Sequence, residues 1–350
     1  MNSLFWRDKR VLLTGHTGFK GAWLTQWLNR LGAKVTGVSL PPATEPSLFA
    51  LAAIGQRCAS HFCDINDRDN LNELIRRARP DVLFHFAAQS LVRPSYREPV
   101  STFATNLMGT VNVLDAVRNS ESIKVAIMVT TDKVYHNHEW LWPYRETDVL
   151  GGHDPYSASK AASEIVIASY RDAFLRRQGV AVASARAGNV IGGGDWAEDR
   201  LIPDAVRCWQ SRQTLVVRQP QSVRPWQHVL EPLAGYLTLA EQLWTRPEIA
   251  GAYNFGPESH ESVTVRKVIE AALSSYGEGS VQYNDGSEGP HEAKYLTLDI
   301  AKARNVLGYR PRWSLLEAVQ RTLSWYRRQR QGERVDVLCE EDIAAFEAAQ

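Results

Sequence analysis

The segment that decides the fold is Val11-Leu12-Leu13-Thr14-Gly15-His16-Thr17-Gly18-Phe19-Lys20-Gly21-Ala22-Trp23-Leu24. A run typical of a buried strand leads into the spacing Gly-x-x-Gly-x-x-Gly, and an amphipathic helical pattern follows. Gly15 permits a tight turn, Gly18 lets backbone N–H groups approach a diphosphate, and Gly21 lets the helix pack on its strand. Because a helix N-terminus carries partial positive charge, the segment predicts a dinucleotide-binding loop. A strand-to-helix turn without a ligand is the alternative.

Short apolar strands alternate with helical patterns through the first half of the chain. The predicted strands cover residues 11–14, 34–40, 61–64, 82–87, 124–130 and 180–186. This alternation predicts an α/β fold with a parallel, doubly wound sheet of the Rossmann type. The periodicity weakens after Gly188. We therefore expect a dinucleotide-binding domain over 1–188, to which part of 226–256 returns, and a smaller mixed α/β substrate lobe over 189–350. The charged tail 327–350 predicts a surface helix or a disordered end.

Composition is that of a globular enzyme with no strong electrostatic field. The 350 residues are 44% hydrophobic, and 40 Lys and Arg against 39 Asp and Glu leave a net charge of +1. This balance does not favour nucleic acid or an anionic membrane as a partner. The four cysteines show neither metal-ligand spacing nor a disulfide framework, and we see no signal peptide or membrane span. We expect a cytoplasmic protein without a metal ion.

Two strand ends bear on how a dinucleotide would be held. An acidic residue after the second strand would bind the ribose 2′-hydroxyl of NAD, and an arginine there would favour NADP. The chain has Ser39 at this position, followed by Pro41 and Pro42, so the choice stays open. The third strand ends at Asp64, which could accept a hydrogen bond from an adenine amino group or act as a helix N-cap or turn residue.

Tyr156 and Lys160 stand four residues apart at a predicted helix start, so their side chains share one face. A phenol with a pKa of about 10 is a poor base at neutral pH, but a nearby ammonium group favours the phenolate. The pair is therefore a candidate catalytic site. The same spacing on a solvated helix face is the alternative.

Four landmarks together resemble the extended short-chain dehydrogenase/reductase family of nucleotide-sugar enzymes. They are the glycine loop, His85-Phe86-Ala87-Ala88-Gln89, Thr130-Thr131-Asp132-Lys133-Val134-Tyr135, and Tyr156 with Lys160. The resemblance implies that Tyr156 takes the proton of a sugar hydroxyl, that Lys160 holds the nicotinamide ribose, and that Thr131 hydrogen-bonds the same hydroxyl. It also implies NAD as cofactor, contacted by Gly15, His16, Thr17, Gly18, Phe19, Lys20, Gly21, Asp64, Ile65, Phe86, Ala87, Ala88, Gln89, Tyr156 and Lys160.

The pair Asp132-Lys133 indicates which branch of the family the chain resembles. Epimerases of the family usually carry small residues after the hydroxyl residue, whereas dTDP-glucose and GDP-mannose dehydratases carry an acidic pair. A lysine in the second position resembles the pattern of the family branch that dehydrates CDP-glucose. Two further segments resemble that branch: Gly193-Gly194-Asp195-Trp196 and Arg224-Pro225-Trp226-Gln227-His228-Val229. A salt-bridged turn is the alternative for the pair. An epimerase, or a 4,6-dehydratase of another nucleotide sugar, is the alternative for the chain.

The resemblance implies an NAD-dependent hydro-lyase that converts CDP-D-glucose to CDP-4-dehydro-6-deoxy-D-glucose and water, in deoxysugar biosynthesis of the kind that supplies O-antigen lipopolysaccharide. Oxidation at C4 makes the C5 proton removable, and the hydrogen taken from C4 returns to C6. In this scheme Tyr156 accepts the C4 hydroxyl proton and protonated Asp132 assists departure of the C6 hydroxyl. Lys133 either removes the C5 proton, if burial or a cation lowers its pKa, or stabilises the enolate as a cation.

Substrate binding and assembly are assigned by the same resemblance. The residues implied to contact the nucleotide diphosphate are Arg93, Asn189 and Arg224, and His291 is implied to bind the substrate near its nucleotide, with the atoms that it touches left open. A guanidinium group suits diphosphate oxygens, although a surface salt bridge is the alternative for Arg224. Helical patterns around 105–117 and 156–176 correspond to helices that pair across a two-fold axis in this family. We therefore expect a homodimer or homotetramer.

Overall fold

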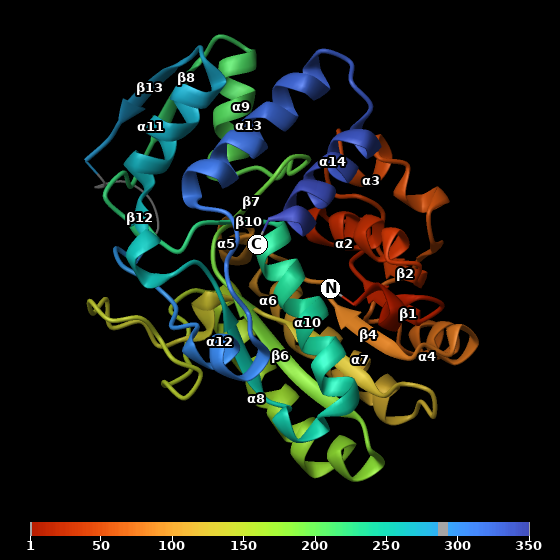
Figure 1. Cartoon of the computed structure of the whole chain (residues 1–350). Helices are drawn as coiled ribbons and strands as arrows, with labels where there is room; N and C mark the ends of the chain where they lie inside the picture. The colour runs from red at the N-terminus through yellow and green to blue at the C-terminus, as the bar shows by residue number, and fades with distance from the viewer. Residues whose placement is uncertain (1, 286–292, 350) are drawn as a thin grey trace.

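The computed structural model describes residues 2–285 and 293–349. At its centre lies a seven-stranded parallel sheet with the order β11-β6-β5-β4-β1-β2-β3 (Figure 1). The strands are β1 (Arg10–Thr14), β2 (Lys34–Ser39), β3 (Ala59–Phe62), β4 (Val82–His85), β5 (Val125–Val129), β6 (Ala181–Ala187) and β11 (Ala252–Phe255). Strand order reverses between β1 and β4, as in a Rossmann sheet. The predicted doubly wound α/β fold is therefore confirmed.

Helices cover both faces of this sheet. Those of one face are α4 (Arg68–Ala78), α7 (Gly109–Arg118) and α8 (Pro155–Ala173); those of the other are α2 (Phe19–Arg30), α10 (Leu230–Thr245) and α12 (Ala301–Leu307). Along β1, Leu12 joins the core beneath α4 and α7, whereas Val11 and Leu13 join the core beneath α2 and α10. Burial on both faces explains why the strands are continuous apolar runs rather than alternating ones.

The seventh strand reaches the sheet after a long excursion through the chain. β6 ends at Ala187 and β11 begins at Ala252, yet the two strands pair in parallel, with Ala252 opposite Ser184. The helix before β11, α10, packs on β5 and β6. Residues of the segment 226–256 therefore lie against the sheet, while most of the chain between Gly188 and α10 lies in the smaller lobe.

The smaller lobe lies above the sheet in Figure 1 and is built from short elements. Its main elements are α9 (Leu201–Gln210), β8 (Thr214–Val217), α11 (Val265–Tyr276), β13 (Ser280–Tyr283) and α13 (Leu315–Arg330). Two short strand pairs are separate from the central sheet: β7 (Val190–Ile191) with β10 (Gln227–His228), and β9 (Val223–Arg224) with β12 (Val263–Thr264). The remaining α-helices are α1 (Ser3–Trp6), α3 (Leu48–Leu51), α5 (Val92–Arg97), α6 (Pro99–Phe103) and α14 (Val335–Ala348).

The charged tail differs from its prediction because α14 buries one side against α2. Ile343 and Phe346 are fully buried, and the Trp27 ring meets Phe346 edge-on with centroids 5.7 Å apart. The Trp27 indole N–H also donates to the Glu347 carboxylate at 2.8 Å. The charged residues of this segment therefore frame an apolar stripe, which makes α14 part of the core rather than a loose surface helix.

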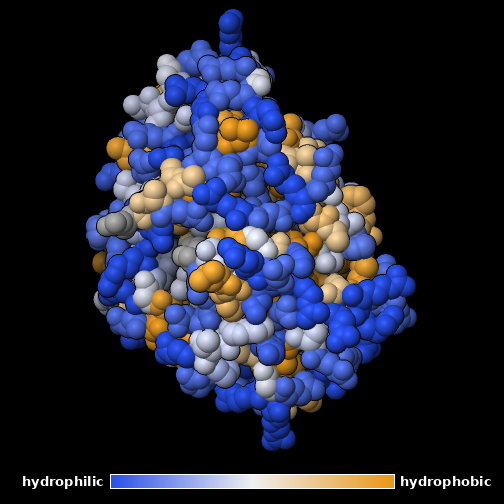
Figure 2. Space-filling model, turned by 45° about the vertical axis from the view of Figure 1, so that its right-hand side comes forward, coloured by the Kyte–Doolittle hydropathy of each residue, from blue (hydrophilic) through white to orange (hydrophobic). Residues whose placement is uncertain are grey.

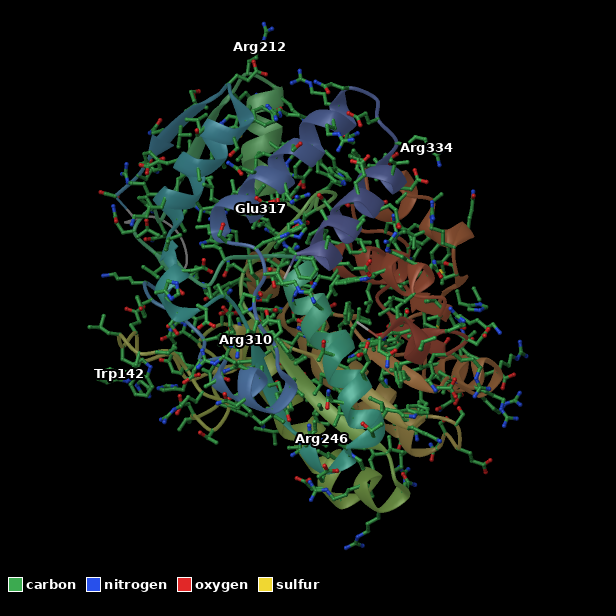
Figure 3. All side chains as sticks on the ribbon, viewed as in Figure 1. Trp142, Arg212, Arg246, Arg310, Glu317 and Arg334 are labelled. Atoms are coloured by element: carbon green, nitrogen blue, oxygen red, sulfur yellow. The ribbon has the colours of Figure 1, made fainter. Side chains whose placement is uncertain are left out.

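The outer surface is predominantly hydrophilic, with scattered apolar patches (Figure 2). One apolar tip is Leu141 with Trp142, which is 63% exposed and projects at the margin of the molecule in Figure 3. Across residues 2–285 and 293–349, every helix is too short or too polar to cross a membrane.

Candidate active site

A cleft of about 2750 Å³ separates the carboxyl ends of the sheet strands from the smaller lobe. Ligand pockets commonly enclose about 300–1000 Å³, so this cleft has room for two ligands end to end. It includes the point where strand order reverses, between β1 and β4, which is where open α/β sheets bind ligands. Tyr156, Lys160, Asn189 and Arg224 all line it.

The glycine loop between β1 and α2 lets neighbouring backbone segments, and a ligand, approach its backbone closely. Gly15 has φ +81°, and a Cβ there would lie 2.7 Å from the Ala87 backbone nitrogen. A Cβ on Gly21 would lie 2.1 Å from the Gly15 carbonyl oxygen. Gly18 is the N-cap of α2, and no side chain caps it. The first N–H groups of α2 are therefore open to an anion, as a dinucleotide diphosphate requires.

Most residues assigned to the cofactor line the cleft, but three have side chains engaged elsewhere. The lining residues are Gly15, Thr17, Gly18, Phe19, Lys20, Gly21, Ile65, Phe86, Ala87, Ala88, Tyr156 and Lys160. His16 is buried, with Nε2 2.7 Å from the Ser60 hydroxyl, and burial lowers its pKa to about 4. Gln89 bonds both backbone groups of Leu91, and Asp64 accepts the Asn66 N–H at 2.8 Å. Asp64 is thus a turn residue in this structure.

The end of β2 fits NAD better than NADP. The Ser39 hydroxyl lies 2.8 Å from that of Thr17, which donates to the Leu40 carbonyl at 2.9 Å. The segment 39–48 contains Glu45 but neither lysine nor arginine. It therefore offers no cation of its own to a ribose 2′-phosphate, whereas hydroxyl groups suit a free ribose.

Tyr156 and Lys160 lie together in the first turns of α8. Asp154 caps this helix by accepting the Ser157 N–H at 2.9 Å. Both Tyr156 and Lys160 are buried, and the Lys160 ammonium donates to the Val129 carbonyl at 3.3 Å. Burial lowers the pKa of Lys160 to about 8.

The expected lowering of the Tyr156 pKa by Lys160 is wrong. Burial raises the pKa of Tyr156 to about 12, and this effect outweighs a hydrogen bond with Thr131 and the charge of Arg200, which lower it. Desolvation penalises a buried phenolate strongly. A phenolate at this position therefore needs further positive charge from what binds in the cleft.

A buried ion pair that sequence reasoning missed lies behind Lys160. Glu164 accepts from Arg186 at 2.8 Å and from the Ser184 hydroxyl at 2.6 Å, and it also accepts from Thr130. These contacts tie α8 to β5 and β6 directly beneath the site. The sequence did contain a clue to this role, because Glu164 lies one helical turn after Lys160 on the same helix face.

Thr131 and Asp132 form a buried turn at the end of β5. The Thr131 hydroxyl donates to Asp132 Oδ1 at 2.9 Å and accepts the Lys133 N–H at 3.3 Å. Asp132 is 1% exposed, and its Oδ2 has no hydrogen-bond partner within the described residues. A Cβ on Gly188 would lie 3.1 Å from this oxygen, so the absence of a side chain leaves it room. Oδ2 is the oxygen available to a ligand.

Lys133 lies beside Asp132 and is partly exposed to solvent. Its ammonium lies 3.9 Å from Asp132 Oδ1, and its side chain is 31% exposed. A partly solvated lysine beside a carboxylate is suited to act as a cation.

The substrate end of the cleft carries most of the residues assigned to a diphosphate. The buried Arg224 guanidinium donates to the carbonyls of Val223 and Ala293. Asn189 Oδ1 is buried and has no partner among the described residues, while Arg93 pairs with Asp199 at 3.3 Å. His291 lies outside the described residues.

Arg200 is a further cleft residue that the sequence did not single out. It pairs with Asp195 at 2.8 Å and donates to the Ser90 hydroxyl at 3.1 Å, so it joins the smaller lobe to the loop after β4. The sequence contains one clue to this role, because Arg200 follows the noted motif Gly193-Gly194-Asp195-Trp196 by four residues.

Residues 12–322 match the family model described as GDP-mannose 4,6 dehydratase. The chain belongs to the GDP-mannose 4,6-dehydratase family. A CDP-glucose 4,6-dehydratase of Salmonella typhimurium is 44% identical to it, over 99% of this chain and 98% of the relative. A dTDP-glucose 4,6-dehydratase of Streptomyces antibioticus is 31% identical over 76% of each chain. The predicted relationship to nucleotide-sugar dehydratases of the extended short-chain dehydrogenase/reductase family is confirmed.

Solved structures share the fold of this GDP-mannose 4,6-dehydratase family member. A UDP-glucose-4-epimerase of Stenotrophomonas maltophila with bound NAD superposes with a TM-score of 0.80 and 21% identity, over 93% of this chain and 100% of the other. A dTDP-glucose 4,6-dehydratase of Bacillus anthracis in complex with NAD gives 0.77 and 21%, over 93% and 98%. Epimerases and dehydratases thus share one fold, and the site must decide between them.

Proposed function

We propose that the protein is an NAD-dependent CDP-D-glucose 4,6-dehydratase. The observation that carries the proposal is the buried turn Thr131-Asp132: Asp132 lines the same cleft as Tyr156 and Lys160, and its Oδ2 has no hydrogen-bond partner among the described residues. A pure oxidation and reduction at C4 needs no such acid, whereas loss of the C6 hydroxyl does. The Salmonella relative, similar over nearly the whole chain, supports cytidine as the nucleotide.

The chain has the groups that would hold NAD. The open N–H groups of α2 suit the diphosphate, Ser39 suits the adenosine ribose, and Lys160 suits the nicotinamide ribose. Bound there, NAD would supply an acceptor for the hydride from C4 and a donor for its return to C6. In this arrangement residues 1–188, with part of 226–256, hold the cofactor, and 189–350 mainly hold the nucleotide sugar.

Tyr156 accepts the C4 hydroxyl proton during oxidation. Its pKa is raised to about 12 by burial even though the Thr131 hydroxyl and the charge of Arg200 favour the phenolate, so this role requires further positive charge beside the phenol. Thr131 also lies where it can hydrogen-bond the same sugar hydroxyl.

Asp132 assists the elimination. Thr131 holds Oδ1, which leaves Oδ2, once protonated, to donate its proton to the departing C6 hydroxyl. Lys133 acts as a cation that stabilises the enolate while water accepts the C5 proton. Arg224, Asn189 and Arg93 hold the diphosphate at the substrate end.

We further infer a homodimer or homotetramer in the cytoplasm. The helix predicted around 105–117 is a π-helical turn (Ala104–Met108) followed by α7, and it packs beside α8. This surface exposes Met108 at 50% and Ile165 at 61%, which suits pairing with a second copy. The four cysteines are unpaired, as a reducing compartment favours. Light scattering that gives a monomer of 39.3 kDa at micromolar concentration would contradict the assembly.

The test of the function is incubation with the glucose esters of CDP, dTDP and UDP, and with GDP-mannose. We expect the alkaline absorbance of a 4-keto sugar, with loss of one water by mass, for CDP-glucose above the others. An epimerase would isomerise its substrate without loss of water, and preference for another nucleotide would reject the CDP assignment.

A further inference from the structure

Trp226 is a residue of the cleft wall that the reaction scheme leaves without a role. It lies between β9 and β10, lines the cleft, and is 5% exposed. Its indole N–H has no hydrogen-bond partner in the part of the chain that the structure describes. An indole N–H can only donate, and a buried donor in a folded protein normally has an acceptor. The unsatisfied N–H of Trp226 therefore indicates an acceptor that arrives with a ligand.

Trp226 is the neighbour of Asn189 across a short strand pair. β10 and β7 pair in parallel with Gln227 opposite Val190, so the residues that precede these two strands lie side by side. The Gln227 N–H donates to the Asn189 carbonyl at 3.0 Å, which extends the pairing to this position. Asn189 also lines the cleft, and its buried Oδ1 has no partner among the described residues. An unsatisfied donor and an unsatisfied acceptor thus lie on adjacent residues of the cleft wall.

The same wall continues to the turn that carries Asp132. A Cβ on Gly188 would lie 2.4 Å from the Pro225 side chain and 3.1 Å from Asp132 Oδ2, so Gly188 separates these two groups. The wall therefore runs from Asp132, at the reacting end, to Arg224, at the diphosphate end. In a hexose nucleotide, C1 carries the diphosphate and C4, C5 and C6 react, so C2 and C3 lie between these two ends.

We propose that the Trp226 indole N–H donates to the C2 or C3 hydroxyl of the hexose, and that the same hydroxyl donates to Asn189 Oδ1. This deepens the proposed function and rests on its assignment of a hexose nucleotide as substrate. A hydroxyl group both donates and accepts, so a single one satisfies both side chains. Tyr156 and Asp132 engage the C4 and C6 hydroxyls, and the amide nitrogen of Asn189 is left for the diphosphate. Trp226 is thus a substrate-binding residue that orients the unreacting edge of the sugar.

The experiment removes the Trp226 N–H and keeps the packing of the ring. In the full-length protein, Trp226→3-benzothienylalanine retains both rings and has sulfur in place of the N–H. Because one net hydrogen bond changes an equilibrium constant by roughly 3- to 10-fold, KM for CDP-glucose should rise by this factor while kcat changes little. The calorimetric affinity for CDP, which lacks the hexose, should stay as in wild type. The matched control is the same replacement of Trp325, which is buried outside the cleft and should leave KM unchanged.

Deoxy substrates identify the hydroxyl and test the contact directly. CDP-2-deoxyglucose and CDP-3-deoxyglucose each lack one of the two candidates. The analogue without the contacted hydroxyl should have the same KM with the wild-type and the Trp226-replaced protein, whereas the other analogue should show the full increase. An equal increase with CDP-glucose and both analogues would make Trp226 a structural residue and overturn the proposal. Unchanged KM for CDP-glucose would also overturn it, as would a loss of affinity for CDP.

Failure of the proposed function is a separate outcome. If the protein acts on another hexose nucleotide, or epimerises its substrate, the same KM comparison is made with that compound and its own deoxy analogues. A hydroxyl-dependent increase in KM would then support the role of Trp226 and reject the CDP-glucose dehydratase assignment alone.

Discussion

The two ends of the cleft are built in different ways. The cofactor end is mainly backbone, with Gly15, Gly18 and Gly21 in one loop that leaves N–H groups open. The substrate end is made of side chains from distant segments, and two of their oxygens, Asp132 Oδ2 and Asn189 Oδ1, are buried without a hydrogen-bond partner in the part of the chain that the structure describes. An unsatisfied buried polar group costs about 1–3 kcal/mol. The comparison indicates a cofactor end whose backbone is preformed, and a substrate end at which these two side-chain oxygens are left for a ligand.

The largest effect should come from Tyr156→Phe, at the junction of the two ends. The phenol oxygen is the group that accepts the C4 proton, so we expect turnover of CDP-glucose to fall by about 10⁴-fold, the upper end for general base catalysis. Stopped-flow absorbance at 340 nm should show no reduced nicotinamide after substrate is added. A transient of wild-type size would show that another group takes this proton.

The next largest effect should be a loss of stability when the buried ion pair of Glu164 with Arg186 is broken. Glu164→Gln leaves Arg186 buried without its counter-charge, which should lower the free energy of unfolding by about 3–5 kcal/mol. Denaturant unfolding checks this. The matched control is Glu317→Gln on α13, whose more exposed pair with Arg321 should contribute less than about 1 kcal/mol (Figure 3). Equal losses of unfolding free energy in the two variants would mean that the buried pair stabilises the fold no more than the exposed one.

Asp132→Asn should affect the elimination and spare the oxidation. Loss of a general acid should slow product formation by about 10²–10³-fold, within the usual range. Reduced nicotinamide should then accumulate at 340 nm, or the oxidised sugar should appear with its C6 hydroxyl retained. Wild-type elimination in this variant would make Asp132 a structural turn residue and remove the main support for a dehydratase.

The smallest effect concerns pH at the cofactor end. Lys20 has its pKa lowered to about 8, so it is cationic below pH 8 and loses its charge as pH rises above that value. ADP-ribose affinity should therefore fall by up to about tenfold between pH 7 and 9.5. Lys160, also with a pKa of about 8, contributes to this decline, so Lys20→Met should show a shallower one. Identical pH profiles for the wild-type and Lys20→Met proteins would show that Lys20 does not bind the diphosphate.

Sequence patterns predicted the features that depend on neighbouring residues. The strand periodicity and the glycine spacing gave the sheet and the loop, and the four-residue spacing placed Tyr156 and Lys160 on one face of α8. These features follow from helix and strand geometry, which a short segment determines by itself. The turn at Thr131 likewise follows directly from the end of β5.

Features that depend on tertiary packing were not predictable in the same way. His16 lies in the glycine loop, but its ring turns into the core because Gly37 leaves space for it; a Cβ on Gly37 would lie 2.3 Å from the ring. Arg200 reaches the cleft only through its contacts with Asp195 and Ser90. The high pKa of Tyr156 reflects how deeply it is buried, which spacing alone does not reveal.

The packing of α14 against α2 has a consequence for biosynthesis. Trp27 on α2 contacts Glu347, 320 residues later in the chain, and its ring is covered by Phe346. On the ribosome, α2, which follows the glycine loop, is therefore made long before α14, which covers its apolar side. Until α14 emerges, the nascent chain exposes a tryptophan-rich surface of the kind that chaperones bind. Cofactor capture by a fully packed α2 must await the emergence of α14 from the ribosome.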